Sequence, residues 1–297
     1  MEVARVDAAR VRSDRAEFLA AFDAQLRGPV SIRPPVGAHE EADGPVHRAW
    51  GWSPRGLVTP GDLSQLDGSQ LDQLIERQIA FFAAHSLAFE WKTYAHDRTA
   101  GIIQRLLRAG FVPEARETVV IGRARDLSRA PTLPSGVTLR EVTSLTDADR
   151  MAELLTRVEG DDVSYLGPMF ARERAADPHG VVLLVAEAEG QVVSTARLNL
   201  VPGTEFATLW SGSTHPQWRR QGLYRATVAY RARVAAARGF KYLQVDASEN
   251  SRPILERLGF LSVSSTTPFV WSPGPGPQIA NAWSDPVSRR GSERAGD

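Results

Sequence analysis

The segment "HPQWRRQG", residues 215–222, places two arginines and a glycine directly before a strongly periodic helix; it is named the arginine turn below. The first N–H groups of a helix have no acceptor within the helix, and the helix dipole favours negative charge there. Gly222 allows a ligand to approach the main chain closely, and Arg219 and Arg220 can donate charge-assisted hydrogen bonds to phosphates. The pattern indicates an anion-binding turn. A solvated helix start is the alternative.

Groups that could accept or donate a proton surround this turn. Asp246, at the end of the strand "YLQVDAS", leads the candidate bases because open α/β sheets bind ligands at the carboxyl ends of their strands. Glu205, before the preceding strand, and His215, beside the turn, are further candidates. Each of the three also has a structural explanation as a loop charge, a turn cap or a strand-end hydrogen-bonding group. Trp210 could line an acceptor pocket, or belong to the core. The hydroxyl and amide groups that follow Asp246 belong to Ser248, Asn250 and Ser251.

Composition narrows the function classes. The chain has 297 residues, which suggests about two domains. Its net charge of zero gives no basic field for nucleic acid. The absence of cysteine excludes disulfides, thiol nucleophiles and thiolate metal sites, and no HExxH, P-loop or GxSxG motif occurs. The first 15 residues are charged and lack the apolar core that a signal peptide would have, and the longest apolar run, 181–186, is too short to span a bilayer. We expect a cytoplasmic monomer or homodimer with no metal and no nucleic-acid or membrane partner.

Alternating strands and helices must position these groups. In the second half we expect strands at 137–142, 206–214, 242–248 and 264–271, a hairpin over 180–201, and helices at 146–160, after Gly222 and at 252–260. The hairpin should turn near Glu189–Gly190. On the helix after Gly222, the expected inward face is Leu223, Thr227, Tyr230, Val234 and Ala237. The side chains expected to point away are Arg225, Arg231, Arg233 and Arg238.

The first half has a similar order of elements. The expected helices are 15–28, one opened by "LDGSQ" and 99–111, and the expected strands are 46–52, 56–60, 87–94 and 117–122. Gly110–Phe111 follows its short helix as Gly259–Phe260 follows the later one, which suggests a duplication. Before the central helix of the first half stands "TPGDLSQLDGSQ", which contains Asp62 and Asp67 and no arginine, a poor place for phosphates. Residues 126–136 have the composition of a linker.

The stretches "HPQWRRQG", "YLQVDAS" and "RPILERLGF", in this order, resemble the GNAT acetyltransferase superfamily over 137–272. The first half resembles a degenerate GNAT-like repeat, so the layout is similar to that of tandem GNAT proteins. The resemblance implies an α/β fold with two GNAT-like domains, each a mixed, mostly antiparallel sheet flanked by helices, with splayed central strands in the second. The implied division is 1–130 for the degenerate domain and 137–272 for the catalytic domain. Residues 273–297 are expected to be a disordered tail, because they are rich in Pro, Gly, Ser and Arg and have almost no apolar periodicity.

The resemblance also implies a co-substrate, acetyl-CoA, with its pyrophosphate at the arginine turn and its pantetheine arm along the preceding strand. The cofactor-binding residues carried over by position, with Asn250 added from its place in the chain, are Ser213, Thr214, Arg219, Arg220, Gln221, Gly222, Leu223, Tyr224 and Asn250. The candidate catalytic residues are Asp246, Ser251 and Glu205. Two positions depart from the family pattern. Tyr224 stands where a small residue is usual, and Leu255 stands where the family often has a tyrosine that protonates the leaving thiolate.

The sequence therefore predicts an acetyl-CoA-dependent N-acetyltransferase that acts on the primary amine of a small molecule. Two alternatives stay open: a non-catalytic acyl-CoA-binding regulatory module, and a protein N-acetyltransferase. The expected degenerate half would cover the sheet and shape the acceptor cleft.

Overall fold

The computed structural model describes residues 2–27, 37–129, 132–160 and 162–274. The chain falls into two compact units that are each discontinuous in sequence. The C-terminal unit holds Thr118–Val263 with residues 2–18, and the N-terminal unit holds Leu19–Glu117 with the described residues from Ser264 onward. As a statement about separate domains, the division into 1–130 and 137–272 stays a prediction. Residues 275–297 of the expected disordered tail lie outside the described residues.

The C-terminal unit contains a mixed, mostly antiparallel sheet in the order β7-β8-β9-β10-β11-β6. The strands are β6 (Glu117–Arg123), β7 (Val137–Glu141), β8 (Val181–Ala188), β9 (Gln191–Leu200), β10 (Phe206–Thr214) and β11 (Tyr242–Ala247). Strands β10 and β11 are parallel, and the other neighbouring pairs are antiparallel. The hairpin of β8 and β9 turns as expected, because Glu189 and Gly190 both have a positive φ, as a type I′ turn requires.

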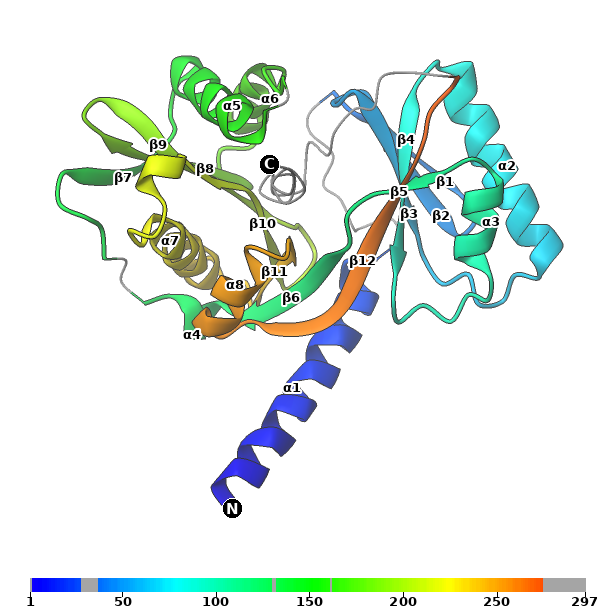
Figure 1. The fold of residues 1–297 in the computed structure, drawn as a ribbon, viewed down its shortest axis with the longest axis horizontal. Helices are drawn as coiled ribbons and strands as arrows, with labels where there is room; N and C mark the ends of the chain where they lie inside the picture. The colour runs from blue at the N-terminus through cyan, green and yellow to red at the C-terminus, as the bar shows by residue number, and fades with distance from the viewer. Residues whose placement is uncertain (1, 28–36, 130–131, 161, 275–297) are drawn as a thin grey trace, which may run out of the picture. The chain divides into compact units, whose positions relative to one another are not determined.

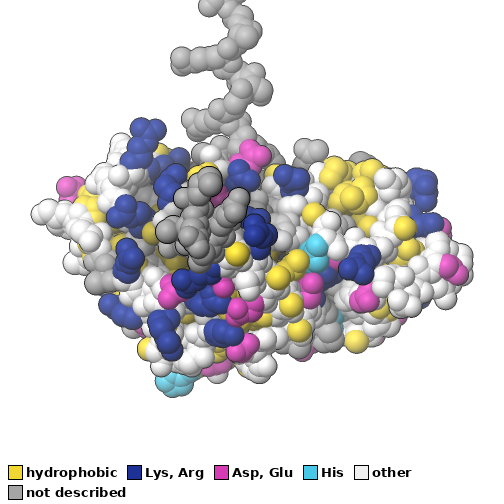
Figure 2. Space-filling view, turned by 90° about the horizontal axis from the view of Figure 1, so that it is seen from below, with side chains coloured by type: hydrophobic (Ala, Val, Ile, Leu, Met, Phe, Trp, Pro, Cys, Tyr) yellow, Lys and Arg dark blue, Asp and Glu magenta, His cyan; other side chains and the backbone are white. Residues whose placement is uncertain are grey.

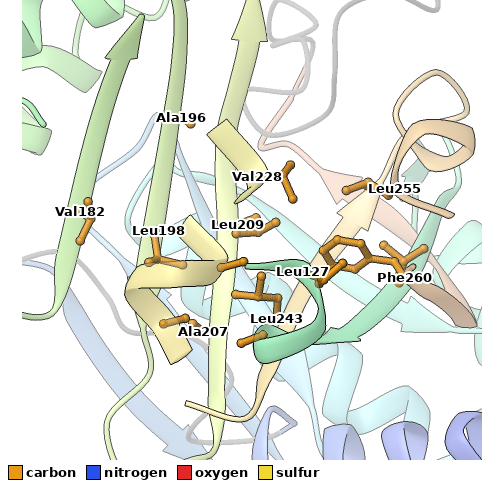
Figure 3. Packing of buried hydrophobic residues seen from close by; sticks show 14 of the residues in the cluster. Leu127, Val182, Ala196, Leu198, Ala207, Leu209, Val228, Leu243, Leu255 and Phe260 are labelled. Carbon is orange, nitrogen blue, oxygen red and sulfur yellow. The ribbon is translucent and has the colours of Figure 1, made fainter. Parts of the chain in front are cut away.

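Helices cover both faces of this sheet (Figure 1). The helices are α4 (Ala124–Leu127), α5 (Leu145–Glu159), α6 (Leu166–Ala176), α7 (Leu223–Ala237) and α8 (Arg252–Leu258). Helices α5 and α6 lie on one face, and α7 lies on the other. The core beneath α7 joins side chains of the central strands, α7 and α8 (Figure 3), among them Leu198, Leu209, Val228, Leu243, Leu255 and Phe260. Removal of these apolar surfaces from water stabilises the layers. The sequence did not predict α6.

The buried face of α7 differs from the expected one. Leu223 and Thr227 are buried as predicted, but Arg231 is also buried, with 1% of its surface exposed, and Ala237 is exposed. The prediction that Arg231 points away from the core is wrong. Residues four apart lie on one stripe of a helix, so Arg231 follows Leu223 and Thr227 inward. Its guanidinium is tolerated there because backbone carbonyls accept its hydrogen bonds.

In the N-terminal unit the strands follow the order β1-β2-β3-β4-β12, with β5 paired to β12. Its elements are β1 (His39–Asp43), β2 (Val46–Trp50), β3 (Arg55–Pro60), β4 (Ala88–Tyr94), β5 (Val112–Pro113), β12 (Leu261–Trp271), α2 (Gly68–Ala84) and α3 (Ile102–Arg108). Helix α1 (Glu2–Gln25) contributes to both units. Strands β3 and β4 are parallel and are joined by α2, as β10 and β11 are joined by α7. Aromatic side chains, including Phe82, Phe89 and Trp91, fill its core. Strand β1 was not expected from the sequence.

The repeated order of elements is present in both halves. Helices α3 and α8 have seven residues each, and a left-handed glycine followed by a buried phenylalanine ends each of them: Gly110–Phe111 and Gly259–Phe260. The last strand of each half, however, pairs with a strand of the other unit. Strand β6 pairs with β11 along its length, and β12 pairs with β4. A fragment that ends at residue 130 would therefore lack a strand of the N-terminal unit.

Candidate active site

The two central strands of the C-terminal unit diverge at the end that leads into the arginine turn. Pairing between β10 and β11 stops at Thr208 and Gln244, although β10 continues to Thr214. Beyond Thr208, β10 also shifts its register against β9 at a bulge, where Ser211 has a φ of 50°. A bulge bends a strand and increases its twist. The structure confirms the expected splay of the central strands. The region beyond Thr208 and Gln244, where β10 and β11 diverge, is called the splay below.

The arginine turn presents backbone donors at the start of α7. Arg220 and Gly222 both have a left-handed backbone, with φ of 64° and 87°, and N–H groups in such turns form concave anion-binding nests. Within the described chain, no side chain caps α7 at Gly222. The first hydrogen bond of the helix runs from the Ala226 N–H to the Gly222 carbonyl at 3.0 Å. The N–H groups of residues 223–225 therefore have no acceptor within the helix.

The side chains of the turn leave this helix end open. Arg219 and Arg220 are exposed, and the Arg219 Nε donates to the Thr214 carbonyl at 3.1 Å, which ties the turn to the end of β10. Gln221 Nε2 donates to a carbonyl within the turn, that of Gln217, at 3.1 Å. Among the described residues, a β-carbon added to Gly222 would meet only the Thr132 carbonyl oxygen within 4 Å, at 3.9 Å. The structure thus brings the predicted residues 214 and 219–222 together around an accessible helix end.

Two residues predicted to bind the cofactor can do so only through their backbone. The side chain of Leu223 is buried in an apolar cluster with Val137 and Val193. Ser213 is also buried, and its carbonyl accepts a hydrogen bond from Ser194 Oγ at 2.8 Å. Thr214 Oγ1 lies 2.9 Å from the same Ser194 hydroxyl. The end of β10 is therefore held by Ser194 of β9, and its opposite edge is the one that β11 has left.

The candidate residues on β11 and in the segment that follows it form a second group of possible site residues. Asp246 lies on β11 beyond its last pair with β10, and its Oδ1 accepts a hydrogen bond from Gln244 Nε2 at 2.8 Å. Ser251 is buried, with its Oγ 3.2 Å from Ser248 Oγ, whereas Asn250 is exposed. Leu255 is fully buried in the core beneath α7 (Figure 3). No proton donor replaces the family tyrosine at this position.

Glu205 lies at the far end of β10. Its backbone carbonyl accepts from the N–H groups of Lys241 and Tyr242, at the beginning of β11. Nine residues of β10 then separate it from the arginine turn, a span of roughly 30 Å. The structure does not bring Glu205 together with the other candidates. His215, in contrast, lies in the turn, and its buried Nδ1 has no hydrogen-bond partner among the described residues.

Arg231 is a residue near the site that sequence reasoning missed. Its Nη1 donates to the carbonyls of Arg197 and Trp210, at 3.0 and 3.4 Å, and its Nε donates to that of Thr227 at 3.1 Å. Burial lowers the pKa of Arg231 to about 10, so the guanidinium remains charged at neutral pH. The stripe of residues four apart, Leu223, Thr227 and Arg231, was the signal that could have found it.

The corresponding helix start in the N-terminal unit is closed by its own side chains. Asp67 accepts a hydrogen bond from the Gln70 N–H at 2.9 Å, and Gln70 Oε1 accepts one from the Asp67 N–H at 2.9 Å. In this capping box a carboxylate already occupies the position where an anion would bind. The two halves therefore differ physically at the equivalent point, as the acidic sequence before α2 suggested.

The described part of the chain shows neither a cluster of metal ligands nor a membrane-spanning helix. Among those residues, no three His, Asp or Glu side chains gather as metal ligands, and no helix has the length and apolar character that crossing a membrane requires. Basic and acidic side chains are mixed over the face shown in Figure 2, in keeping with the net charge of zero.

Residues 148–260 match the family model described as "Acetyltransferase (GNAT) family". This part of the chain is similar to GNAT acetyltransferase domains. Three solved structures share the fold: a GCN5-related N-acetyltransferase from Kribbella flavida (18% identity, TM-score 0.62, 90% of this chain and 96% of that chain), a GCN5-related N-acetyltransferase from Sphaerobacter thermophilus (14%, 0.60, 78% and 78%), and a tandem GNAT protein from the clavulanic acid biosynthesis pathway (14%, 0.60, 89% and 95%). No curated protein matches the chain.

Proposed function

We propose that this protein transfers the acetyl group of acetyl-CoA to a primary amine of a small molecule. The observation that carries the proposal is the uncapped start of α7, with Arg219 and Arg220 beside it, at the point where β10 and β11 diverge. The similarity to GNAT domains supports acyl transfer in general, and the open helix end supports an anionic co-substrate.

In this proposal the N–H groups of residues 223–225 and the two exposed guanidiniums bind the pyrophosphate. Charged donors and a helix dipole act together on one anion here. The pantetheine arm then follows β10 back from Thr214 toward Thr208, along the edge that β11 has left. The thioester thereby reaches the splay, where Asp246 stands on β11.

Transfer to an amine requires a neutral nitrogen, because an ammonium group has no lone pair for attack. Asp246, directly or through a water molecule, accepts the proton that the amine loses. The neutral nitrogen then attacks the thioester carbon. The C–S bond breaks with its electron pair on sulfur, and the nitrogen releases one further proton to solvent as the amide forms. Holding both substrates in the splay converts a bimolecular reaction into an effectively unimolecular one. This positioning supplies much of the rate enhancement.

A non-catalytic acyl-CoA-binding module is the second candidate, and the burial of Leu255 at the position of the family's usual acid favours it. Release of CoA thiol separates the two candidates. The full-length protein is incubated with acetyl-CoA and a panel of small primary amines, with a peptide bearing a free N-terminus included to detect a protein acceptor. We expect amine-dependent thiol release in step with acetylated amine. Tight binding of acetyl-CoA without release for any amine would favour the binding module.

The number of acetyl-CoA molecules bound per chain tests the difference between the halves. We expect one, because the start of α2 is closed by Asp67 and Gln70 whereas the start of α7 is open. Calorimetric titration of the full-length chain measures this number, and a fragment is unsuitable because β12 completes the N-terminal unit. A stoichiometry of two would contradict this division of labour.

A further inference from the structure

The large side chain of Tyr224 lies against the bulge of β10. A β-carbon added to Gly212 would lie 3.1 Å from Tyr224 Cε2 and 3.9 Å from its Cδ2. Gly212 follows Ser211 in the segment that β11 has left. The ring therefore occupies the place of a side chain at position 212 and turns inward, over the splay. Tyr224 therefore does not extend outward from the helix start into solvent.

The buried guanidinium of Arg231 lies at the same point. Its Nη2 would be 3.8 Å from the β-carbon added to Gly212, and Tyr224 interacts electrostatically with Arg231. Through Nη1, Arg231 also holds the Trp210 carbonyl, one residue before the bulge. A positive charge, a phenol and the bulged strand thus meet in one place.

The remaining surroundings of Tyr224 are mostly apolar. Its ring packs against the core cluster of β9, β10, β11 and α8, whose members include Leu198, Leu209, Leu243 and Leu255. The other charged groups nearby in the chain are the exposed arginines of the turn and Arg225. A cation beside a phenol attracts the negative charge that develops on the phenol oxygen as its proton is transferred.

We propose that Tyr224 is the proton donor to the sulfur of the leaving CoA, and that Arg231 is the positioning residue that orients it and the bulge. This inference rests on the proposed acetyltransferase function. It assigns to the start of α7 the role that Leu255 on α8 cannot perform.

The amine nitrogen bonds to the thioester carbon, and the carbonyl electron pair moves to oxygen. As the C=O bond re-forms, the C–S bond breaks with its electron pair on sulfur. Sulfur takes the proton from Tyr224 Oη, and the phenolate regains a proton from water. The proton lost by the amine goes to Asp246 or to solvent.

A binding experiment tests the contact without any acceptor. CoA and desulfo-CoA, which lacks the sulfur, are titrated into wild type and Tyr224→Phe at about pH 9. At this pH an alkyl thiol like that of cysteine, with a pKa of about 8.5, is largely ionised. We expect wild type to prefer CoA by about tenfold, since a hydrogen bond to a charged group contributes about 1.5–3 kcal/mol, and Tyr224→Phe to lose most of this preference. Tyr230→Phe is the matched control, because Tyr230 lies on the same helix with its hydroxyl bonded to Glu141.

Kinetics supply a second readout. Tyr224→Phe should lower kcat by about tenfold to 100-fold, at the low end for a lost general acid because a thiolate is a good leaving group, with the KM for acetyl-CoA within about threefold. The wild-type rate should fall at high pH as the phenol ionises. This fall, the alkaline limb of the pH–rate profile, should be absent in Tyr224→Phe. Removal of the cation in Arg231→Met raises the phenol pKa and should move the limb to higher pH. Arg231→Lys, which keeps the charge, should leave the limb near its wild-type position.

The outcomes separate the two proposals. If wild type binds neither CoA nor desulfo-CoA, the proposed function and this inference are both overturned. If CoA binds but Tyr224→Phe keeps the preference for CoA and behaves like Tyr230→Phe, only the role of Tyr224 is overturned. If Arg231→Met folds and the alkaline limb does not move, Arg231 has no part in tuning the acid. Should Arg231→Met fail to fold, a limb that disappears in Arg231→Lys would overturn the same point.

Discussion

Gly222→Glu is expected to lower the affinity for acetyl-CoA by at least about 100-fold, equivalent to roughly 2.8 kcal/mol. The new carboxylate would stand at the uncapped start of α7, where the phosphates are proposed to bind. Unit charges about 4 Å apart repel by roughly 1 kcal/mol in water and by about 4 kcal/mol at the effective dielectric of a protein surface. Steric loss of the N–H contacts adds to this repulsion.

Gly222→Ala is the matched control, because Gly222 has a φ of 87° and any other residue is strained there. The strain is about 1–2 kcal/mol and is present with and without ligand, so it lowers the melting temperature more than the affinity. No described residue lies closer than 3.9 Å to a β-carbon at this position, so Gly222→Ala should bind acetyl-CoA within about tenfold of wild type. Calorimetric titration and melting curves of both variants measure the two effects. Equal losses of affinity in both would mean that charge at this helix end does not matter, and would refute the phosphate site.

Asp246→Asn is expected to lower turnover by about 100- to 10,000-fold, the usual range for loss of a general base. An amide cannot accept the proton of the amine, but it retains an oxygen that can accept the hydrogen bond from Gln244. The affinity for acetyl-CoA should therefore change by no more than about threefold. Steady-state rates, together with binding measurements, separate the two quantities.

Glu205→Gln provides the contrast, because Glu205 lies beside the start of β11 and not at the splay. Its turnover should be within about twofold of wild type, as for surface positions outside the site. A normal rate in Asp246→Asn would remove Asp246 from the mechanism. A large loss in Glu205→Gln would show that the acceptor binds at the other end of β10.

The parts of the fold that local sequence determines were predicted well. The hairpin turn at Glu189–Gly190 needs two positive φ angles and appears where the sequence indicates it. The glycine that ends α8 is likewise left-handed, at Gly259. The arginine turn was found because an unpaired helix start, a glycine and adjacent arginines are neighbours in the chain.

The missed features depend on distant segments. Arg231 could not be placed inward from the sequence because its acceptors, on Arg197 and Trp210, are 34 and 21 residues away. The exchange of β6 and β12 between the two units has no local signal, since either unit could accept an apolar strand. Glu205 was grouped with the site because it adjoins β10 in sequence, but the two ends of a strand lie far apart.

Hydrogen exchange of the full-length protein, with and without acetyl-CoA, tests most directly whether the co-substrate binds at the start of α7. Bound phosphates and a pantetheine arm along β10 would hold amides that are otherwise open to solvent. We expect slower exchange at residues 209–214 and 220–225 on addition of acetyl-CoA, with no change at 62–72, where the capping box closes α2. Unchanged exchange at 220–225, or protection centred on 62–72, would contradict it.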